Sequence, residues 1–258
     1  MAARSIDLNC DMGESFGAWT MGQDEAVLPH VSSINVACGF HAGDPDVMLR
    51  TVRAAHARGV AIGAHVSLPD LQGFGRREMK VSPNEVYSLT AYQVGALAGI
   101  ARAAGARVNH VKAHGALYNQ LARDAALARA HAEAVRDAAP GLVLYALAGS
   151  VALVAGRAAG LAVAGEAFAD RSYEADGSLT PRSQPGAVID DPERAAAQLV
   201  AIVDTGKVFA RDGAIVAIDA QTICVHGDRH DAAAFARVLR GRLDACGIAV
   251  RAVAGAAA

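Results

Sequence analysis

Lysine, aromatic residues and paired cysteines are all scarce in this sequence. Aromatic residues make up 5% of the 258 residues, and the lysines are limited to Lys80, Lys112 and Lys207. The formal net charge of −2 gives no electrostatic reason to expect nucleic acid or an anionic membrane as the main partner. The cysteines show no CxxC spacing, which excludes a zinc knuckle or a thioredoxin-type motif, and we expect those in apolar runs to be buried, reduced thiols.

Sequence signals of several other protein classes are also missing. The N-terminal residues reach an acidic motif at Asp7 without the apolar segment of about 7–15 residues that a secretory signal needs. The longest uncharged stretch, Gly141–Gly156, is shorter than the roughly 18 residues of a membrane-spanning helix. The sequence contains neither a Walker A motif nor a GxSxG element. We therefore expect a cytoplasmic protein that binds no membrane and has no P-loop of its own.

Apolar, strand-like runs alternate with helical patterns along the whole chain. Helices are expected after Asp44, Ser82 and Asp191, each of which is followed by proline, and over about Asp231–Ala245. This alternation predicts a parallel sheet covered by helices, and with eight or so strands and no linker we expect one domain over residues 1–258, an irregular (β/α) barrel of the TIM type. The expected strands are Ile6–Cys10, Ile34–Cys38, Val60–His65, Val108–Lys112, Leu142–Leu147, Leu161–Glu166, Ile215–Ile218, Ile223–His226 and Ile248–Val253.

Six short polar motifs each close one of these apolar runs. Because catalytic residues of parallel-strand folds gather where strands end, we expect the six motifs to converge on one pocket, which indicates an enzyme. The polar segment Ala169–Gly186 is expected to form an ordered loop over that pocket. The motifs are Asp7–Glu14, Ala37–Asp44, Gly63–His65, Val111–Tyr118, Glu166–Arg171 and Val225–Asp228.

The first two motifs carry two carboxylates and a histidine. Asp11 and Glu14 have the chemistry to bind a metal or to act as a general base, and the alternative is a helix N-cap with a first-turn acid. His41 directly precedes the Asp44 cap, where backbone N–H groups can form an anion site. A structural histidine bonded to a loop carbonyl is the alternative there.

The third and fourth motifs contribute two more histidines and a lysine. His65 ends a strand of apolar residues and glycine, so its side chain is expected at the mouth of a barrel. Lys112 and His114 point to the same side of an extended strand, where they can combine anion binding with proton transfer in a solvated pocket. Desolvation would lower the lysine pKa, and a simple salt bridge is the alternative. Asp11, His65 and His114 also form an acceptable ligand set for a divalent cation, although no local spacing supports it.

Further charged residues are candidates for binding substrate or phosphate. Glu166, Asp170 and Arg171 form an acid–acid–base set at the head of the long loop. Two consecutive arginines after a Gly-rich turn offer guanidinium forks for carboxylate or phosphate, with solvated surface as the alternative. The full set of binding candidates is Glu14, Arg76, Arg77, Glu166, Arg171, His226 and Asp228.

Taken together, these motifs resemble the LamB/YcsF family along nearly the whole chain. The resemblance implies an irregular (β/α) barrel related to polysaccharide deacetylases, in the A subunit of the prokaryotic ATP-dependent 5-oxoprolinase. It also implies ATP-driven opening of 5-oxo-L-proline to L-glutamate, with subunits B and C as partners and ATP bound together with them. The matching segments are Asp7–Gly17, Asn35–Asp44, Gly63–His65, Gly73–Arg77, Val111–Asn119, Glu166–Arg182 and Cys224–Asp228.

The implied reaction assigns roles to the candidate residues. A five-membered lactam is a poor electrophile, and phosphorylating its amide oxygen would turn that oxygen into a leaving group. Hydrolysis then needs a base for water, either Asp11 or Asp170, and groups that stabilise anions. The residues expected to act in catalysis are Asp11, His41, Lys112 and Asp170, with Arg171 as a further cation.

Two other classes of function stay open. A stand-alone, metal-dependent carbohydrate deacetylase or hydrolase would act without ATP and lose activity with a chelator. A non-catalytic subunit that only holds 5-oxo-L-proline for its partners would tolerate the loss of Lys112 or Asp11.

Overall fold

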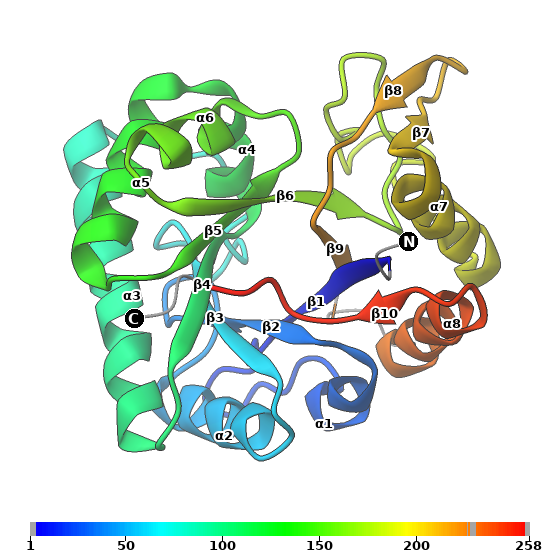
Figure 1. Ribbon diagram of the computed structural model, residues 1–258. Helices are drawn as coiled ribbons and strands as arrows, with labels where there is room; N and C mark the ends of the chain where they lie inside the picture. The colour runs from blue at the N-terminus through cyan, green and yellow to red at the C-terminus, as the bar shows by residue number, and fades with distance from the viewer. Residues whose placement is uncertain (1–3, 226, 228–230, 256–258) are drawn as a thin grey trace.

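Seven parallel strands close into a barrel in the computed structural model, which describes residues 4–225, 227 and 231–255 (Figure 1). Each strand pairs with the next one in the ring, and β9 returns to pair with β1. This closed barrel with helices around it confirms the predicted fold. The strands of the ring are β1 (Ser5–Met12), β2 (Ser33–Ala37), β3 (Ala61–Val66), β4 (Val108–Ala113), β5 (Val143–Leu147), β6 (Ala162–Phe168) and β9 (Thr222–Val225).

The helices lie outside the ring of strands (Figure 1). The side chains of Asp44, Ser82 and Asp191 accept hydrogen bonds from first-turn backbone N–H groups, so three helices start where the capping residues predict. No helix of the described residues is long and apolar enough to cross a membrane. The helical segments are α1 (Asp24–Val27), η1 (Leu28–His30), α2 (Pro45–His56), α3 (Pro83–Ala103), α4 (Gly115–Arg123), α5 (Ala125–Ala138), α6 (Val151–Ala158), α7 (Pro192–Thr205) and α8 (Ala232–Ala245).

Two of the expected strands differ from the prediction. Strand β8 (Ile215–Ala217) pairs antiparallel with β7 (Lys207–Phe209) in a separate two-stranded sheet, because the short connection between them leaves no room for a crossover helix. At the C-terminal end only β10 (Ala249–Val250) forms, pairing with Ser5 and Ile6 of β1. The pairing of β1 with β9 begins at the next residue, Asp7, which limits β10 to this short edge.

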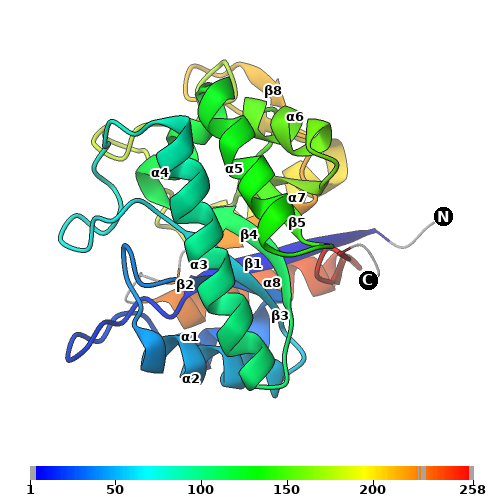
Figure 2. The ribbon, with the colours of Figure 1, turned by 90° about the vertical axis from the view of Figure 1, so that its left-hand side faces the viewer.

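Side chains alternate along β1 between a polar face inside the barrel and an apolar face outside it. On β1, Leu8, Cys10 and Met12 belong to the hydrophobic core, whereas Asp7 and Asn9 are buried and form hydrogen bonds to neighbouring strands. Because all strands of the ring are parallel, their carboxyl ends lie at one end of the barrel. The loops that follow β1 and β3 project there, to the left in Figure 2. The fold therefore places the polar motifs together at one end.

Candidate active site

A cavity of about 1000 Å³ opens at the carboxyl ends of the barrel strands. Strands β1, β3 and β4 contribute Asp11, His65 and Lys112 to its lining, and His114 follows β4 directly. Helix α4, the loop between β6 and α7 and strand β8 line other parts of the wall, so the expected loop does border the cavity. Motifs that lie far apart in the sequence thus meet at one site.

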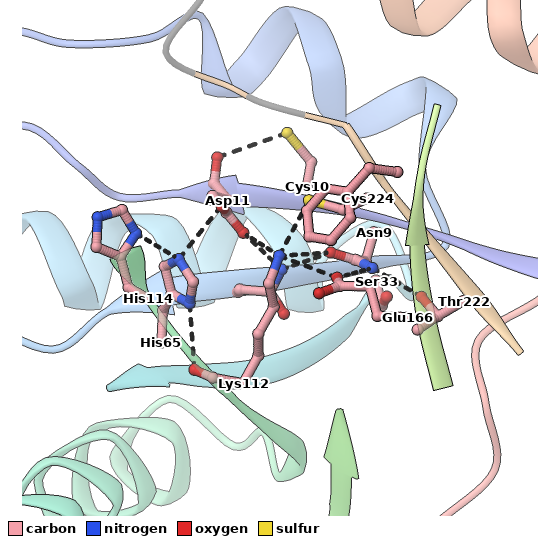
Figure 3. Close-up of polar contacts among 12 residues, drawn as sticks. Asn9, Cys10, Asp11, Ser33, His65, Lys112, His114, Glu166, Thr222 and Cys224 are labelled. Carbon is pink, nitrogen blue, oxygen red and sulfur yellow. Dashed lines mark hydrogen bonds and ion pairs between the residues drawn. The ribbon is translucent and has the colours of Figure 1, made fainter. Parts of the chain in front are cut away.

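Lys112 occupies the floor of this cavity in a buried cluster of charges (Figure 3). Its ammonium donates to Asp11 Oδ1 at 2.9 Å and to Cys224 Sγ at 3.0 Å, and Glu166 Oε1 lies 3.0 Å away. The side chain is only 3% exposed, so the expectation of a solvated lysine does not hold. Burial alone lowers its pKa, but Asp11, Cys224 and Glu166 outweigh burial and raise the pKa well above its ordinary value. Lys112 is therefore a protonated, fully engaged cation.

The two carboxylate oxygens of Asp11 have different environments. Oδ1 accepts hydrogen bonds from Lys112 at 2.9 Å and from the side-chain amide of Asn35 at 2.8 Å. Oδ2 lies 3.3 Å from His65 Nε2, on the side of the histidines (Figure 3). Oδ1 is thus held by Lys112 and Asn35, and Oδ2 faces His65.

The tautomers of His65 and His114 follow from their carbonyl partners. His65 Nδ1 lies 3.2 Å from the carbonyl oxygen of Lys112, and His114 Nε2 lies 2.8 Å from that of Phe74. A carbonyl oxygen only accepts, so both of these nitrogens carry hydrogen. The remaining nitrogens, His65 Nε2 and His114 Nδ1, are 3.0 Å apart. These two nitrogens face each other across a short gap, and Asp11 Oδ2 lies 3.3 Å from the same His65 Nε2.

Glu14 and His41 join this pair of histidines to form a four-residue cluster. One ligand atom from each of Glu14, His41, His65 and His114 lies within 4.8 Å of the other three, and all four residues are buried. The ring of His41 stacks on that of His114 with centroids 4.0 Å apart. Neither ring nitrogen of His41 has a hydrogen-bond partner among the described residues, although Glu14 Oε1 lies 3.7 Å from its Nε2. We call these four residues the histidine cluster.

Burial keeps two rings of the histidine cluster neutral. It is the largest cause that lowers the pKa of His41 and of His114 well below the ordinary value, and the neighbouring histidines add to the effect. Neutral imidazoles leave their lone pairs available to a cation. The cluster contains two of the three residues predicted for a metal site, whereas the third, Asp11, directs Oδ1 toward Lys112.

The residues at the head of the long loop separate into different environments. Glu166 is buried next to Lys112, and Asp170 is buried beyond the end of β6 without lining the cavity. Arg171 does line the cavity, and its guanidinium donates to the carbonyl oxygens of Ala187 and Thr180. Burial, together with nearby Arg182, lowers its pKa to about 10.

The remaining binding candidates do not all reach the cavity. Arg76 lines it, with its guanidinium over the ring of Phe74 at 4.8 Å from the centroid. The side chain of Arg77 instead binds the carboxylate of Asp70, with Nε 2.8 Å from Oδ1. The last two predicted site residues, His226 and Asp228, lie outside the described residues.

Two buried asparagines at the site were not among the sequence predictions. Asn9 donates to Glu166 Oε1 at 2.9 Å, and Asn35 donates to Asn9 Oδ1 at 2.7 Å, directly beneath Lys112. Their signal in the sequence is alternation, since Asp7, Asn9 and Asp11 occupy every second position of one otherwise apolar strand. Polar residues repeated at that spacing mark the inward face of a barrel strand.

Comparison with known proteins identifies the family. The model of the LamB/YcsF family matches residues 6–258. This chain belongs to the LamB/YcsF family. The match confirms the resemblance that the motifs indicate, and it extends over nearly all of the chain.

Relatives of this LamB/YcsF protein cover it almost from end to end. It is 61% identical to a Bordetella pertussis protein named as the A subunit of 5-oxoprolinase, over 96% of this chain and 98% of the relative. The crystal structure of a lactam utilization protein from Thermus thermophilus, 50% identical, gives a TM-score of 0.91 and covers 96% of this chain and 100% of that chain. A family 4 carbohydrate esterase from Streptomyces lividans is 14% identical with a TM-score of 0.51 over 97% of each chain, which shows a common fold alone.

Proposed function

We propose that this protein is the A subunit of a 5-oxoprolinase and takes part in the ATP-dependent hydrolysis of 5-oxo-L-proline to L-glutamate. The observation that carries the proposal is the 61% identity, over nearly the full length of both chains, to a relative named as the A subunit of 5-oxoprolinase. The site supports it, because carboxylate, imidazole and guanidinium groups line a single cavity of about 1000 Å³. A small lactam fits well within that volume.

In the proposed hydrolysis, Asp11 is the base. Its Oδ2 is not the oxygen that Lys112 and Asn35 hold, and it lies 3.3 Å from Nε2 of His65, which lines the cavity. The amide oxygen first accepts the γ-phosphoryl group of ATP. Water then adds to the lactam carbonyl carbon and gives one proton to Asp11, and the ring C–N bond breaks as the amine nitrogen takes up that proton. A second water hydrolyses the resulting acyl phosphate and releases phosphate. The Lys112 ammonium lies 2.9 Å from Asp11 Oδ1 and 3.0 Å from Glu166 Oε1, between the two carboxylates.

Arginines on the cavity wall provide the proposed contacts for the substrate carboxylate or a transferred phosphoryl group. Arg171 is the better placed, because two carbonyl oxygens fix its guanidinium and limit the side-chain entropy lost on binding. Arg76 lines the same cavity and lies near enough to lower the pKa of Arg171. An anion between the two would relieve this repulsion.

ATP is proposed to bind together with the partner subunits B and C. The absence of a Walker A motif from the sequence supports this division, as does the word subunit in the names of the relatives. Because the reaction consumes ATP, we place the protein in the cytoplasm.

The test is glutamate formation from 5-oxo-L-proline by the purified chain with and without subunits B and C and ATP. Glutamate is expected only when all components are present, and Asp11→Asn is expected to abolish it. Arg157→Gln, on the outer helix α6, is the matched control and should keep full activity. Turnover by this chain alone, without ATP, would contradict the proposed function and favour a stand-alone hydrolase.

We also propose that the histidine cluster binds one divalent metal ion. His65 and His114 direct one nitrogen each toward the other while a carbonyl oxygen fixes the other nitrogen of each ring, which is the arrangement that metal-binding histidines adopt. Three imidazoles and one carboxylate suit Zn²⁺ or a similar borderline cation. A bound cation would act as a Lewis acid on a carbonyl or phosphoryl oxygen.

Metal binding can be tested independently of activity. Elemental analysis of protein purified without chelator should find about one metal ion per chain, and calorimetry should show Zn²⁺ binding to the chelator-treated protein. His65→Ala and His114→Ala should lose the metal, whereas His131→Ala, which removes a buried histidine outside the cluster, should retain it. Metal-free wild-type protein that does not bind Zn²⁺ would remove this part of the proposal.

A further inference from the structure

Below the cavity, Asn35 connects the proposed base to the interior of the barrel. Its amide nitrogen donates to Asp11 Oδ1 at 2.8 Å and to Asn9 Oδ1 at 2.7 Å, and its oxygen lies 2.8 Å from His110 Nε2. The Asp11 carboxylate only accepts, which requires the Asn35 amino group to face it. The oxygen of Asn35 must then receive its hydrogen bond from His110.

His110 is held in the single protonation form that can make this bond. Its Nδ1 lies 3.4 Å from the Asn109 amide nitrogen, a donor, so the ring hydrogen is on Nε2. Burial lowers the pKa of His110 to about 3, with a further contribution from Lys112, and the ring is neutral. A neutral ring donates to Asn35 without adding a second positive charge next to Lys112.

The surrounding barrel is built to accept this ring. His110 stacks on Tyr145 with centroids 4.0 Å apart and an interplanar angle of 11°. On the neighbouring strand, a Cβ atom at Gly63 would lie 2.0 Å from His110 Nε2. Gly63 does not have a positive φ, so its backbone conformation does not require glycine. The space that the imidazole occupies does require it.

We propose that His110 is a positioning residue for Asp11. Acting through Asn35, it determines which carboxylate oxygen Lys112 and Asn35 hold, and so keeps Oδ2 on the side of His65. Without the imidazole N–H, the Asn35 oxygen would be buried without a donor, and rotation of the amide would bring that oxygen against Asp11 Oδ1. The inference rests on the proposed function, in which Asp11 is the base.

The experiment compares His110→Phe and His110→Gln in the complete complex with subunits B and C, ATP and 5-oxo-L-proline. Phenylalanine keeps a ring against Tyr145 but lacks the donor, so kcat should fall about ten- to a hundredfold with KM within about twofold of wild type. Glutamine restores an N–H donor and should recover a large part of kcat. His131→Phe replaces an equally buried histidine that bonds Thr90, and it should leave kcat unchanged.

Further measurements separate a positioning role from a merely structural one. Asn35→Ser should show the same loss of kcat, and adding His110→Phe to it should cause little further loss, because both changes break one connection. Full kcat in His110→Phe, or equal losses in His110→Phe and His110→Gln, would overturn the proposal. A crystal structure of His110→Phe shows whether Asn35 keeps its amino group on Asp11, whatever the activity. Absence of glutamate with the wild-type complex would instead count against the proposed function.

Discussion

Replacing Lys112 by methionine is the most informative perturbation of the site. Methionine has nearly the same shape but no charge, so Asp11 and Glu166 would remain buried and close together without their cation. Breaking a buried ion pair by removing one partner costs about 3–5 kcal/mol of unfolding free energy. For a chain of this size that corresponds to a fall in melting temperature of roughly 6–20 °C.

A second substitution makes the reasoning quantitative. In the wild-type background, Glu166→Gln removes a charged partner of Lys112 and should destabilise the protein. In the Lys112→Met background the same change removes a repelling carboxylate and should stabilise it. The change of sign corresponds to a coupling energy on the order of 1–3 kcal/mol, which urea unfolding of the four variants would measure.

Activity and a control complete the Lys112 experiment. Loss of the cation also frees Asp11 from its fixed orientation, so kcat for glutamate formation by the complete complex should fall by about a hundredfold or more. Lys207→Met, in the exposed first position of β7, should change neither stability nor activity. The reasoning fails if the free energy of unfolding of Lys112→Met lies within about 1 kcal/mol of the wild-type value and Glu166→Gln changes it equally in both backgrounds. The charge cluster would then not stabilise the fold.

Three further predictions concern parts of the fold outside the charge cluster. Burial lowers the pKa of His131 to about 4, against about 6.5 in the unfolded chain, so the stability that the neutral ring contributes is complete above pH 6.5 and is lost as the pH falls toward 4. The urea midpoint should therefore fall less steeply with decreasing pH in His131→Leu than in wild type, and an equal fall would refute this. Gly95→Ala, at an exposed position of helix α3, should stabilise the protein by about 1 kcal/mol in thermal melting, since no atom lies within 4 Å of the added Cβ. Gly115→Ala should lower the melting temperature, because φ is +57° and its Cβ would lie 2.4 Å from the carbonyl oxygen of Gly75; an unchanged melt would contradict the backbone geometry.

Local signals in the sequence predicted much of the architecture. Capping residues such as Asp44 and Ser82 mark helix starts because their side chains bond backbone groups only three residues away. The apolar runs predict the barrel strands for a similar reason, since burial on both faces of a parallel strand excludes most polar residues. Strand β8 was misplaced because a short apolar run carries no information about its pairing partner. The single domain over residues 1–258 stays a prediction.

The site was predictable in its composition but not in its connections. His65 was expected at the mouth of the barrel and His114 in a pocket beside Lys112, and both histidines line the cavity. The burial of Lys112 and its raised pKa were not foreseen, because its carboxylate partners come from strands far away in the sequence. Arg77 was expected to bind an anionic ligand, yet its side chain is engaged by Asp70 within the same loop.

The sequence by itself determined the alternation of strands and helices, the residue types at each strand end and the family to which the chain belongs. Each of these is read from residues that are close together along the chain. Only the tertiary structure decided that His65 Nε2 meets His114 Nδ1, and that Lys112 meets Cys224, contacts between residues 49 and 112 positions apart. Closure of the barrel sets the register of the strands, and register decides which inward side chains share a layer. The protonation states and hydrogen bonds of the site follow from that arrangement.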